Sequence, residues 1–232
     1  MEIKTLSRIP RADLESLLAP IPFYKAVKQD DPQQFEVLLR HSRLVEFKPG
    51  EVVLRRGERD PWLYFLLKGQ LAVFANDAQG QQVVNYITPG EVFGDLAALV
   101  QQERSATVIA DHNCKQVLVF GTDFKAFGAL ENFGVISLAT KLAYYRNCVH
   151  SLRWKLEVYR MRYPDNPLAS RHRAIKLYSG PKGGREELRA IHEQAQALAK
   201  LLLSWNQEFG SLSLAAEGHS APNPALVDKM TS

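Results

Sequence analysis

The stretch Phe93–Thr107 reads FGDLAALVQQERSAT, and the organisation of the rest of the chain is best understood from it. A glycine-led turn comes first, followed by one apolar helical turn from Asp95, a short polar loop and an arginine beside two small residues. A helix that begins at Asp95 exposes backbone N–H groups, which form a seat for an anion. The planar guanidinium of Arg104 suits a phosphate at the same place. Taken alone the signal is weak, because Arg-Ser-Ala is also an ordinary way to begin an apolar strand.

Glycine-containing segments with short spacings precede this stretch in a fixed order. They are FKPGE at 47–51, RGE at 56–58, LYFLLKG at 63–69 and PGEVFGD at 89–95. Together with the Arg-Ser-Ala at 104–106, this series resembles the cyclic-nucleotide-binding domain of the catabolite activator type, over roughly residues 20–160. The resemblance implies an α+β fold: a β-roll (double-stranded jelly roll) with flanking helices, a long dimerisation helix and a helical C-terminal extension.

The resemblance also implies a ligand and the residues that hold it. The ligand is a cyclic nucleotide, with cyclic AMP (cAMP) expected first and cyclic GMP or cyclic di-GMP as alternatives. The phosphate is expected between the helix amides and Arg104, and a ribose hydroxyl at Asp95, where the family usually has Glu. Asp is one methylene shorter, which leaves this contact strained, bridged by water or absent. The expected ligand-binding residues are Phe93, Gly94, Asp95, Leu96, Ala97, Arg104, Ser105, Ala106 and His150.

The hydrophobic pattern divides the chain into five parts. From Arg43 to Phe120 the apolar period is two, with Pro-Gly and Gly-rich punctuation, which predicts a series of short strands in an antiparallel roll. Short helical patterns at 12–18 and 33–39 precede the strands, and Asp31-Pro32 is a helix start. The expected parts are N-terminal covering helices at 1–42, the β-roll at 43–133, a long helix at 134–163, a basic connector and C-terminal helix at 164–210, and a flexible tail at 211–232.

The long helix carries the strongest periodic signal in the chain. Its apolar residues repeat at alternating steps of three and four, which is typical of a narrow seam between two helices. We expect a parallel homodimer along this seam; the alternative is a helix that lies in a groove of its own β-roll. The expected interface residues are Val135, Leu138, Leu142, Tyr145, Val149, Leu152, Leu156 and Tyr159.

The C-terminal third lacks the winged helix-turn-helix that the resemblance would add. Residues 171–179 have room for one short helix, and a second apolar seam from Leu188 to Phe209 predicts a single long helix with no hairpin after it. Residues 140–185 nevertheless hold eleven basic side chains and only two acidic ones. This is an electrostatic footprint for nucleic acid or an acidic partner, or else the solvated face of a helix and its connector.

The composition excludes several classes of protein. The chain has 232 residues, a net charge of +4 and two cysteines without metal-ligand spacing or a disulfide framework, which is consistent with a reducing compartment. No apolar run reaches the length of a membrane span, so we expect a cytoplasmic protein. The six histidines are scattered, and neither a nucleophile elbow nor a P-loop occurs, so we expect neither an enzyme nor a metal site.

These patterns lead to a first hypothesis and two alternatives. The first is a dimeric cyclic-nucleotide sensor that signals through its long helix and through residues 160–210 to a protein partner. The second keeps the fold but reads DNA through the basic residues 140–185. The third is a structural module with a degenerate pocket that binds no ligand.

Overall fold

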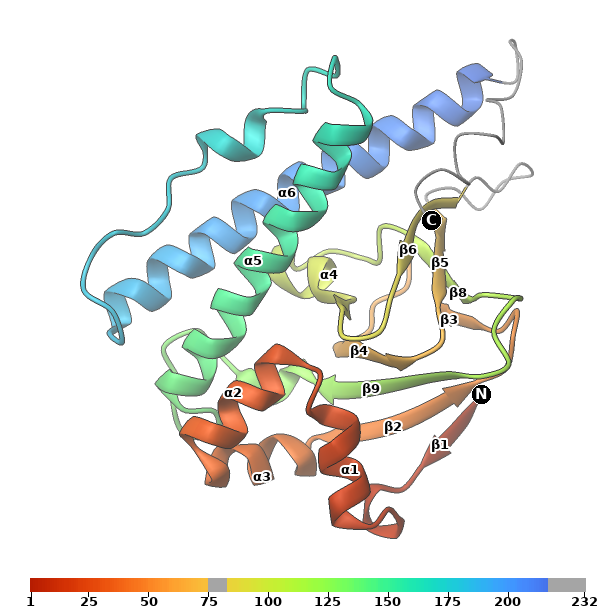
Figure 1. The fold of residues 1–232 in the computed structure, drawn as a ribbon. Helices are drawn as coiled ribbons and strands as arrows, with labels where there is room; N and C mark the ends of the chain where they lie inside the picture. Colours follow the sequence, from red (N-terminus) through yellow and green to blue (C-terminus); the bar gives the residue numbers. More distant parts are fainter. Residues whose placement is uncertain (75–82, 217–232) are drawn as a thin grey trace.

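The computed structural model describes residues 1–74 and 83–216, with side chains as far as position 208. Its centre is a roll of two antiparallel sheets, and the helices lie to one side of it (Figure 1). One sheet has the strand order β1-β2-β9-β4-β7 and the other β3-β8-β5-β6. The strands are β1 (Glu2–Lys4), β2 (Ser42–Phe47), β3 (Val52–Leu54), β4 (Trp62–Lys68), β5 (Leu71–Phe74), β6 (Val83–Ile87), β7 (Val92–Phe93), β8 (Thr107–Ala110) and β9 (Val117–Asp123).

The interior of the roll is apolar because alternate residues of each strand face the opposite sheet. Val45, Leu66, Leu71 and Val119 are buried there together with Val108. The predicted α+β fold, a β-roll with flanking helices, is confirmed. The short strands β1 and β7 were not predicted. At the end of β9, Asp123 caps the 3-10 helix η2 (Phe124–Phe127), since its side chain accepts a hydrogen bond from the Lys125 N–H at 2.9 Å.

The N-terminal segment folds as one 3-10 turn and three short helices. These are η1 (Leu6–Arg8), α1 (Arg11–Leu18), α2 (Pro22–Asp30) and α3 (Pro32–Arg40). Asp31 caps α3, since its side chain accepts a hydrogen bond from the Gln34 N–H at 3.0 Å. The sequence analysis expected α1 and α3 but missed α2. That helix is fixed to the roll by the fully buried Tyr24, whose hydroxyl is hydrogen bonded to Thr122.

Two long helices complete the molecule: α5 (Leu138–Arg162) and α6 (Arg185–Ala216). They run in the same direction, since Tyr145 contacts His192 near one end of the pair and Tyr159 contacts Trp205 near the other (Figure 1). The connector between them returns along α5 and contains η3 (Arg171–Ala174).

The seam of α5 packs inside its own chain. Leu142, Tyr145, Val149, Leu152, Leu156 and Tyr159 are all buried, and α6 is the main helix that covers them. Of the remaining two predicted interface residues, Leu138 is half-buried, and Val135 precedes the helix and is exposed. This corrects the prediction that the seam is a dimer interface, because side chains covered by α6 are not available to a second copy. The homodimer itself stays a prediction without an assigned interface.

The physical reason for the correction lies in the second seam. Leu188, Ile191, Ala195, Leu198 and Leu202 of α6 are buried and belong to the same hydrophobic cluster as the seam of α5. Two complementary apolar stripes on the same chain meet at high effective concentration, which favours pairing within the chain. The side chain of Phe209, the last residue of the predicted seam, lies outside the described residues.

The connector binds back onto α5 and uses much of the basic charge. Arg153 donates to the carbonyls of His172 (3.1 Å) and Ile175 (2.6 Å), while Glu157 accepts from Arg160 and Arg173. Six of the eleven basic side chains of residues 140–185 have hydrogen-bond partners within the chain: Lys141, Arg146, Arg153, Lys155, Arg160 and Arg173. The basic segment is therefore largely structural, with Arg171, Lys176 and Lys182 among its exposed members.

The part of the C-terminal third that the structure describes contains no helix-turn-helix. Between position 163 and Ala216 it holds only η3 and α6, with no strand for a wing. The helix α6 continues beyond position 210, where the sequence analysis placed the start of the flexible tail. The remainder of that predicted tail, residues 217–232, lies outside the described residues.

Candidate functional site

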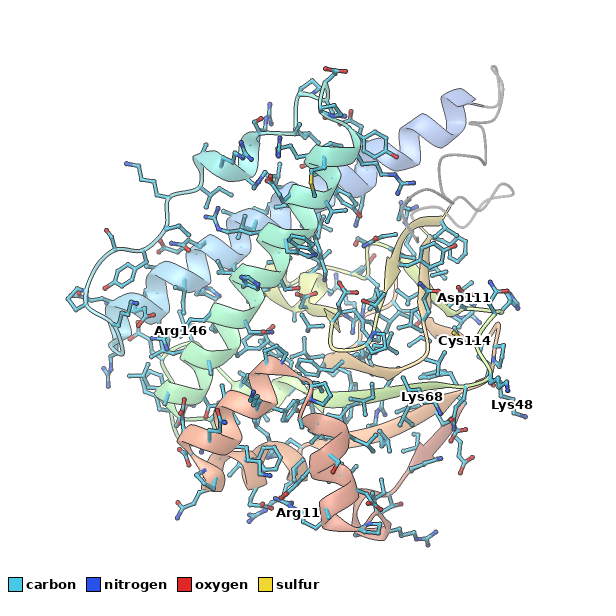
Figure 2. The ribbon with its side chains drawn as sticks, viewed as in Figure 1. Arg11, Lys48, Lys68, Asp111, Cys114 and Arg146 are labelled. Atoms are coloured by element: carbon cyan, nitrogen blue, oxygen red, sulfur yellow. The ribbon has the colours of Figure 1, made fainter. Side chains whose placement is uncertain are left out.

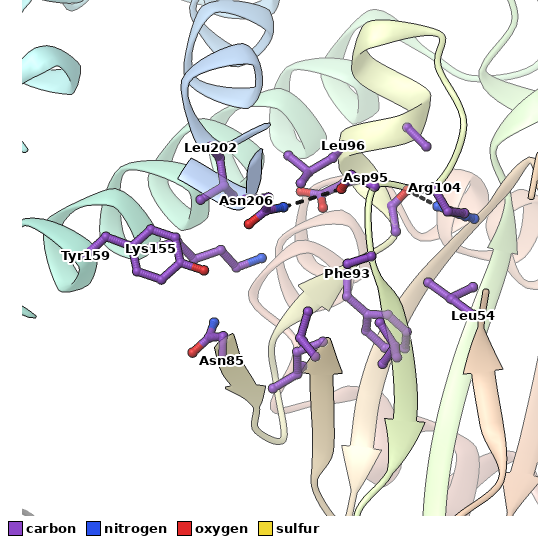
Figure 3. A pocket seen from close by; sticks show the side chains of 17 residues that line it. Leu54, Asn85, Phe93, Asp95, Leu96, Arg104, Lys155, Tyr159, Leu202 and Asn206 are labelled. Carbon is purple, nitrogen blue, oxygen red and sulfur yellow. Dashed lines mark hydrogen bonds between the residues drawn. The ribbon is translucent and has the colours of Figure 1, made fainter. Parts of the chain in front are cut away.

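A cavity lies where the β-roll meets α5 and α6, and it encloses about 90 Å³ (Figure 3). One wall is the segment 93–106, which we call the cassette, and apolar side chains of the roll such as Leu54 and Val108 line the side within the roll. The opposite side is closed by Lys155 and Tyr159 of α5 and by residues of α6. The cavity thus joins the roll to both long helices.

The cassette wall begins with a glycine for two reasons. Gly94 follows β7 and has φ = +78°, a left-handed conformation that side chains with a Cβ rarely adopt. A Cβ at this position would also lie 2.8 Å from Nη1 of Arg104. The turn brings the chain into the short helix α4 (Asp95–Val100), whose first residue lines the cavity.

Arg104 lies beneath this turn and not in bulk water, with only 4% of its surface exposed. Its guanidinium donates to the carbonyl oxygens of Gly94, Asp60 (3.0 Å) and Trp62 (2.8 Å), and lies 3.5 Å from an Asp60 carboxylate oxygen. Its Nε is buried without a hydrogen-bond partner. The arginine is therefore held in position by main-chain carbonyls, and it retains donor capacity at the edge of the cavity.

Asp95 is buried between the cassette and α5. Its Oδ2 lies 3.7 Å from the Cys148 thiol, which donates to it, and only 1% of the residue is exposed. Burial and this carboxylate raise the pKa of Cys148 well above the usual range of a thiol, so Cys148 stays protonated. The Tyr144 hydroxyl is buried nearby without a partner, and burial raises its pKa too. A thiol is a weak donor, so the Asp95 carboxylate has little compensation for its burial within the chain.

The structure brings together eight of the nine residues that were predicted to bind a ligand. Phe93, Gly94, Asp95, Leu96, Ala97, Arg104, Ser105 and Ala106 all line the cavity. The prediction for His150 is wrong, because this side chain is exposed and does not reach the cavity. Five residues along an α-helix rotate a side chain by about 140°, so Lys155, and not His150, faces the cassette.

The groups that close the cavity from the helices were missed. Lys155 donates to the Val92 carbonyl at 3.0 Å, and Figure 3 shows its side chain reaching towards Asp95 and Phe93. Tyr159, which was assigned to a dimer interface, lines the cavity, and burial raises its pKa to about 12, so its hydroxyl is protonated at neutral pH. Asn206 of α6 donates to the Ser105 hydroxyl at 3.4 Å. No sequence motif marks these residues, since their position depends on how α5 and α6 pack.

Two further features of the described residues concern metal binding and membrane insertion. Within residues 1–74 and 83–216, His, Cys, Asp and Glu side chains do not gather in groups that could hold a metal ion. The helices of the same ranges include none with the length and apolar character needed to cross a bilayer.

Residues 44–129 match the family model described as "Cyclic nucleotide-binding domain". A putative potassium channel protein of Rhodopseudomonas palustris is 32% identical over 117 residues, which are 50% of this chain and 27% of that protein. The cAMP-activated global transcriptional regulator CRP of Salmonella typhimurium is 32% identical over 89 residues, 38% of this chain and 42% of that protein. The chain therefore spans less than half the length of either relative.

A solved structure, the regulatory domain of Toxoplasma gondii PKA with cAMP, also resembles this chain. It is 21% identical with a TM-score of 0.45, over 59% of this chain and 49% of that one.

Proposed function

The segment 44–129 is a cyclic nucleotide-binding domain, and from this premise we propose that the protein is a cAMP-responsive sensor rather than an enzyme. The observation that carries the proposal is the position of Arg104. It is a buried cation with a free Nε at the edge of a cavity whose wall is the predicted cassette. The Asp60 carboxylate compensates part of this buried charge, and the unpartnered Nε leaves one charged donor for a phosphate.

The cavity supplies groups for each part of such a ligand. The phosphate would lie against Arg104, Ser105 and the start of α4. A ribose hydroxyl would donate to Asp95, an acceptor that now has only a thiol donor. The purine would extend towards Lys155 and Tyr159 at the helix side of the cavity (Figure 3). We propose cAMP in particular because one relative is named as cAMP-activated, and cyclic GMP and cyclic di-GMP are its competitors in the test.

The output of the sensor is proposed to pass through the two long helices. Lys155 and Tyr159 of α5 and Leu202 and Asn206 of α6 form the helix side of the cavity. A ligand that binds one arrangement of these helices more tightly shifts the population towards it. Residues 160–210 are the proposed contact with a protein partner, because they follow directly from this wall and contain no helix-turn-helix.

Calorimetric titration tests the proposal. The unchanged protein and the Arg104→Ala variant are each titrated separately with cAMP, cyclic GMP and cyclic di-GMP. The Arg59→Ala variant is the matched control. Arg59 is exposed and does not line the cavity, so its loss leaves binding unchanged. We expect saturable binding of cAMP that Arg104→Ala removes while circular dichroism shows a folded chain. Heat-silent titrations with all three nucleotides would favour the structural module with a degenerate pocket.

The DNA-binding alternative has its own measurement. Binding that depends on the basic segment would weaken steeply with salt, roughly in proportion to the number of phosphates contacted. A mobility shift that persists at moderate salt and selects a sequence would restore this alternative. We expect none, since six of the eleven basic side chains have partners within the chain.

A further inference from the structure

The helix α6 reaches across the cassette and closes its cavity from the same chain. Leu202 and Asn206 line the cavity, and Figure 3 shows both side chains on the side of Asp95 and Leu96. Two hydrogen bonds connect α6 to the cassette: from Gln196 Nε2 to the Leu99 carbonyl at 3.2 Å and from Asn206 Nδ2 to the Ser105 hydroxyl at 3.4 Å. This helix lies wholly outside the segment that matches the family model.

The cavity is too small for the proposed ligand in the observed arrangement of α6. Its volume is about 90 Å³, whereas pockets that hold small organic ligands measure roughly 300–1,000 Å³. The roll cannot supply the missing space, because its interior is filled by packed side chains such as Leu54, Ile87 and Val108. The space must come from the helix side, where Leu202 and Asn206 stand in place of a ligand.

The contacts of α6 indicate which part of it can move. Near its start the helix is anchored by Glu187, which is buried and bound at two points by Arg146 of α5. The contacts over the cavity are weaker, since a neutral hydrogen bond of 3.4 Å is at the long limit of such bonds. A tilt of the second half of α6 about its anchored start would break the Asn206–Ser105 bond and leave the Arg146–Glu187 pair intact.

We propose that α6 is an autoinhibitory lid, and that Asn206 holds it on the cassette by donating to the Ser105 hydroxyl, which keeps the side chains of Leu202 and Asn206 in the space that a nucleotide would fill. The inference rests on the proposed function, because it takes the cassette to be the phosphate site. The chain binds nucleotide only in the fraction of molecules whose lid is open, so the apparent dissociation constant is the intrinsic one divided by that fraction. Nucleotide binding therefore moves α6 away from the cassette. The apolar face that α6 covered becomes exposed, and this exposure is the signal.

The proposal predicts whether a mutation strengthens or weakens cAMP binding. Asn206→Ala removes the bond that favours the closed lid, so it tightens cAMP binding, by roughly three- to tenfold for one hydrogen bond. Gln196→Ala, which removes the second bond, tightens it as well. Lys200→Ala is the control on the same helix, since this residue is exposed and does not line the cavity, and the affinity of the variant equals that of the unchanged protein.

Hydrogen exchange on the full chain supplies a second readout. On addition of cAMP we expect faster exchange in residues 196–208 and slower exchange in residues 94–106. Weaker binding by Asn206→Ala, or slower exchange in residues 196–208, overturns the proposal, since α6 would then close on the ligand and contribute to its affinity. Binding by Asn206→Ala but not by the unchanged protein supports it. If neither protein nor Gln196→Ala binds any cyclic nucleotide, the proposed function fails and the lid fails with it.

Discussion

Arg146 of α5 and Glu187 of α6 form a two-point ion pair, with Nε and Nη2 of the arginine each 2.7 Å from a carboxylate oxygen. Figure 2 labels Arg146 where α5 passes the start of α6. Glu187 is 4% exposed, and its Oε2 also accepts a hydrogen bond from the Gly183 N–H. The arginine chiefly lowers the pKa of Glu187, so the carboxylate is charged at neutral pH. The pair fixes the register of α5 and α6.

Glu187→Gln is therefore expected to loosen the start of α6. The neutral amide leaves the guanidinium with a weaker partner, and we expect a loss of about 1–2 kcal/mol in the free energy of unfolding, reduced because Arg146 is partly exposed to solvent. Urea unfolding measures it, and Arg146→Met in a double-mutant cycle isolates the pair. Glu186→Gln, at the exposed neighbour, is the control. Equal stabilities for Glu187→Gln and Glu186→Gln would mean that the pair does not hold the helices together.

The burial of the α5 seam leads to a second prediction, which concerns the stability of the folded chain and not the assembly of a dimer. Leu152 is fully buried beneath α6, so Leu152→Ala should cost about 2–5 kcal/mol in the free energy of unfolding. Trp154→Ala, on the exposed face of the same helix, should change it by no more than about 0.5 kcal/mol. Denaturant unfolding and sedimentation are measured together. A Leu152→Ala protein of unchanged stability but lower mass would return the seam to a dimer interface.

The difference between the expected and the observed role of that seam shows what the sequence can and cannot decide. Alternating steps of three and four specify a helix pair, and both stripes, one from Val135 and one from Leu188, are visible in the sequence. Spacing does not say whether the partner helix belongs to the same chain. The choice depends on whether the connector can return along α5, and it does so through Arg153 and Glu157, whose contacts have no local signature.

The candidate site likewise has a part that the sequence predicts and a part that it does not. The cassette is local in sequence, with its glycine, its helix start and its arginine within fifteen residues, and the structure brings together all its predicted members. The residues that line the cavity from the helix side come from two helices distant in sequence. His150 and Lys155 lie five residues apart on α5, which places their side chains on different faces of the helix. The short β1 and β7 were missed because two or three residues carry too little periodicity to be recognised.

Gly94 gives a prediction that separates backbone strain from damage to the site. Gly94→Ala places a Cβ 2.8 Å from Nη1 of Arg104 and forces alanine into φ = +78°. Gly57→Ala is a matched control, because Gly57 has φ = +81° but no heavy atom within 4 Å of the added Cβ. Both variants should lose about 1–2 kcal/mol of stability from the left-handed conformation. Only Gly94→Ala should also displace Arg104 and abolish cAMP binding, as measured by calorimetry; equal binding by the two variants would contradict this.

Glu157 makes the attachment of the connector sensitive to acid. Its carboxylate accepts hydrogen bonds from Arg160 and Arg173 and lies 2.7 Å from Nε2 of His172, and these partners, Arg160 first, lower its pKa to about 2. In the unfolded chain a glutamate titrates near pH 4.3. The unfolded state therefore binds the proton first, so the contribution of Glu157 is complete at neutral pH and is lost as the pH falls from about 4.3 towards 2.

The measurement compares the thermal stability of the unchanged protein with that of Glu157→Gln between pH 7 and pH 3. At pH 7 the unchanged protein should be more stable, because the carboxylate connects α5 to η3 through His172 and Arg173. The difference should shrink below about pH 4.3, as protonation makes the glutamate resemble the amide. Asp165→Asn, at an exposed position in the same connector, should show no such trend. A difference that stays constant down to pH 3 would show that Glu157 holds the connector by shape and not by charge.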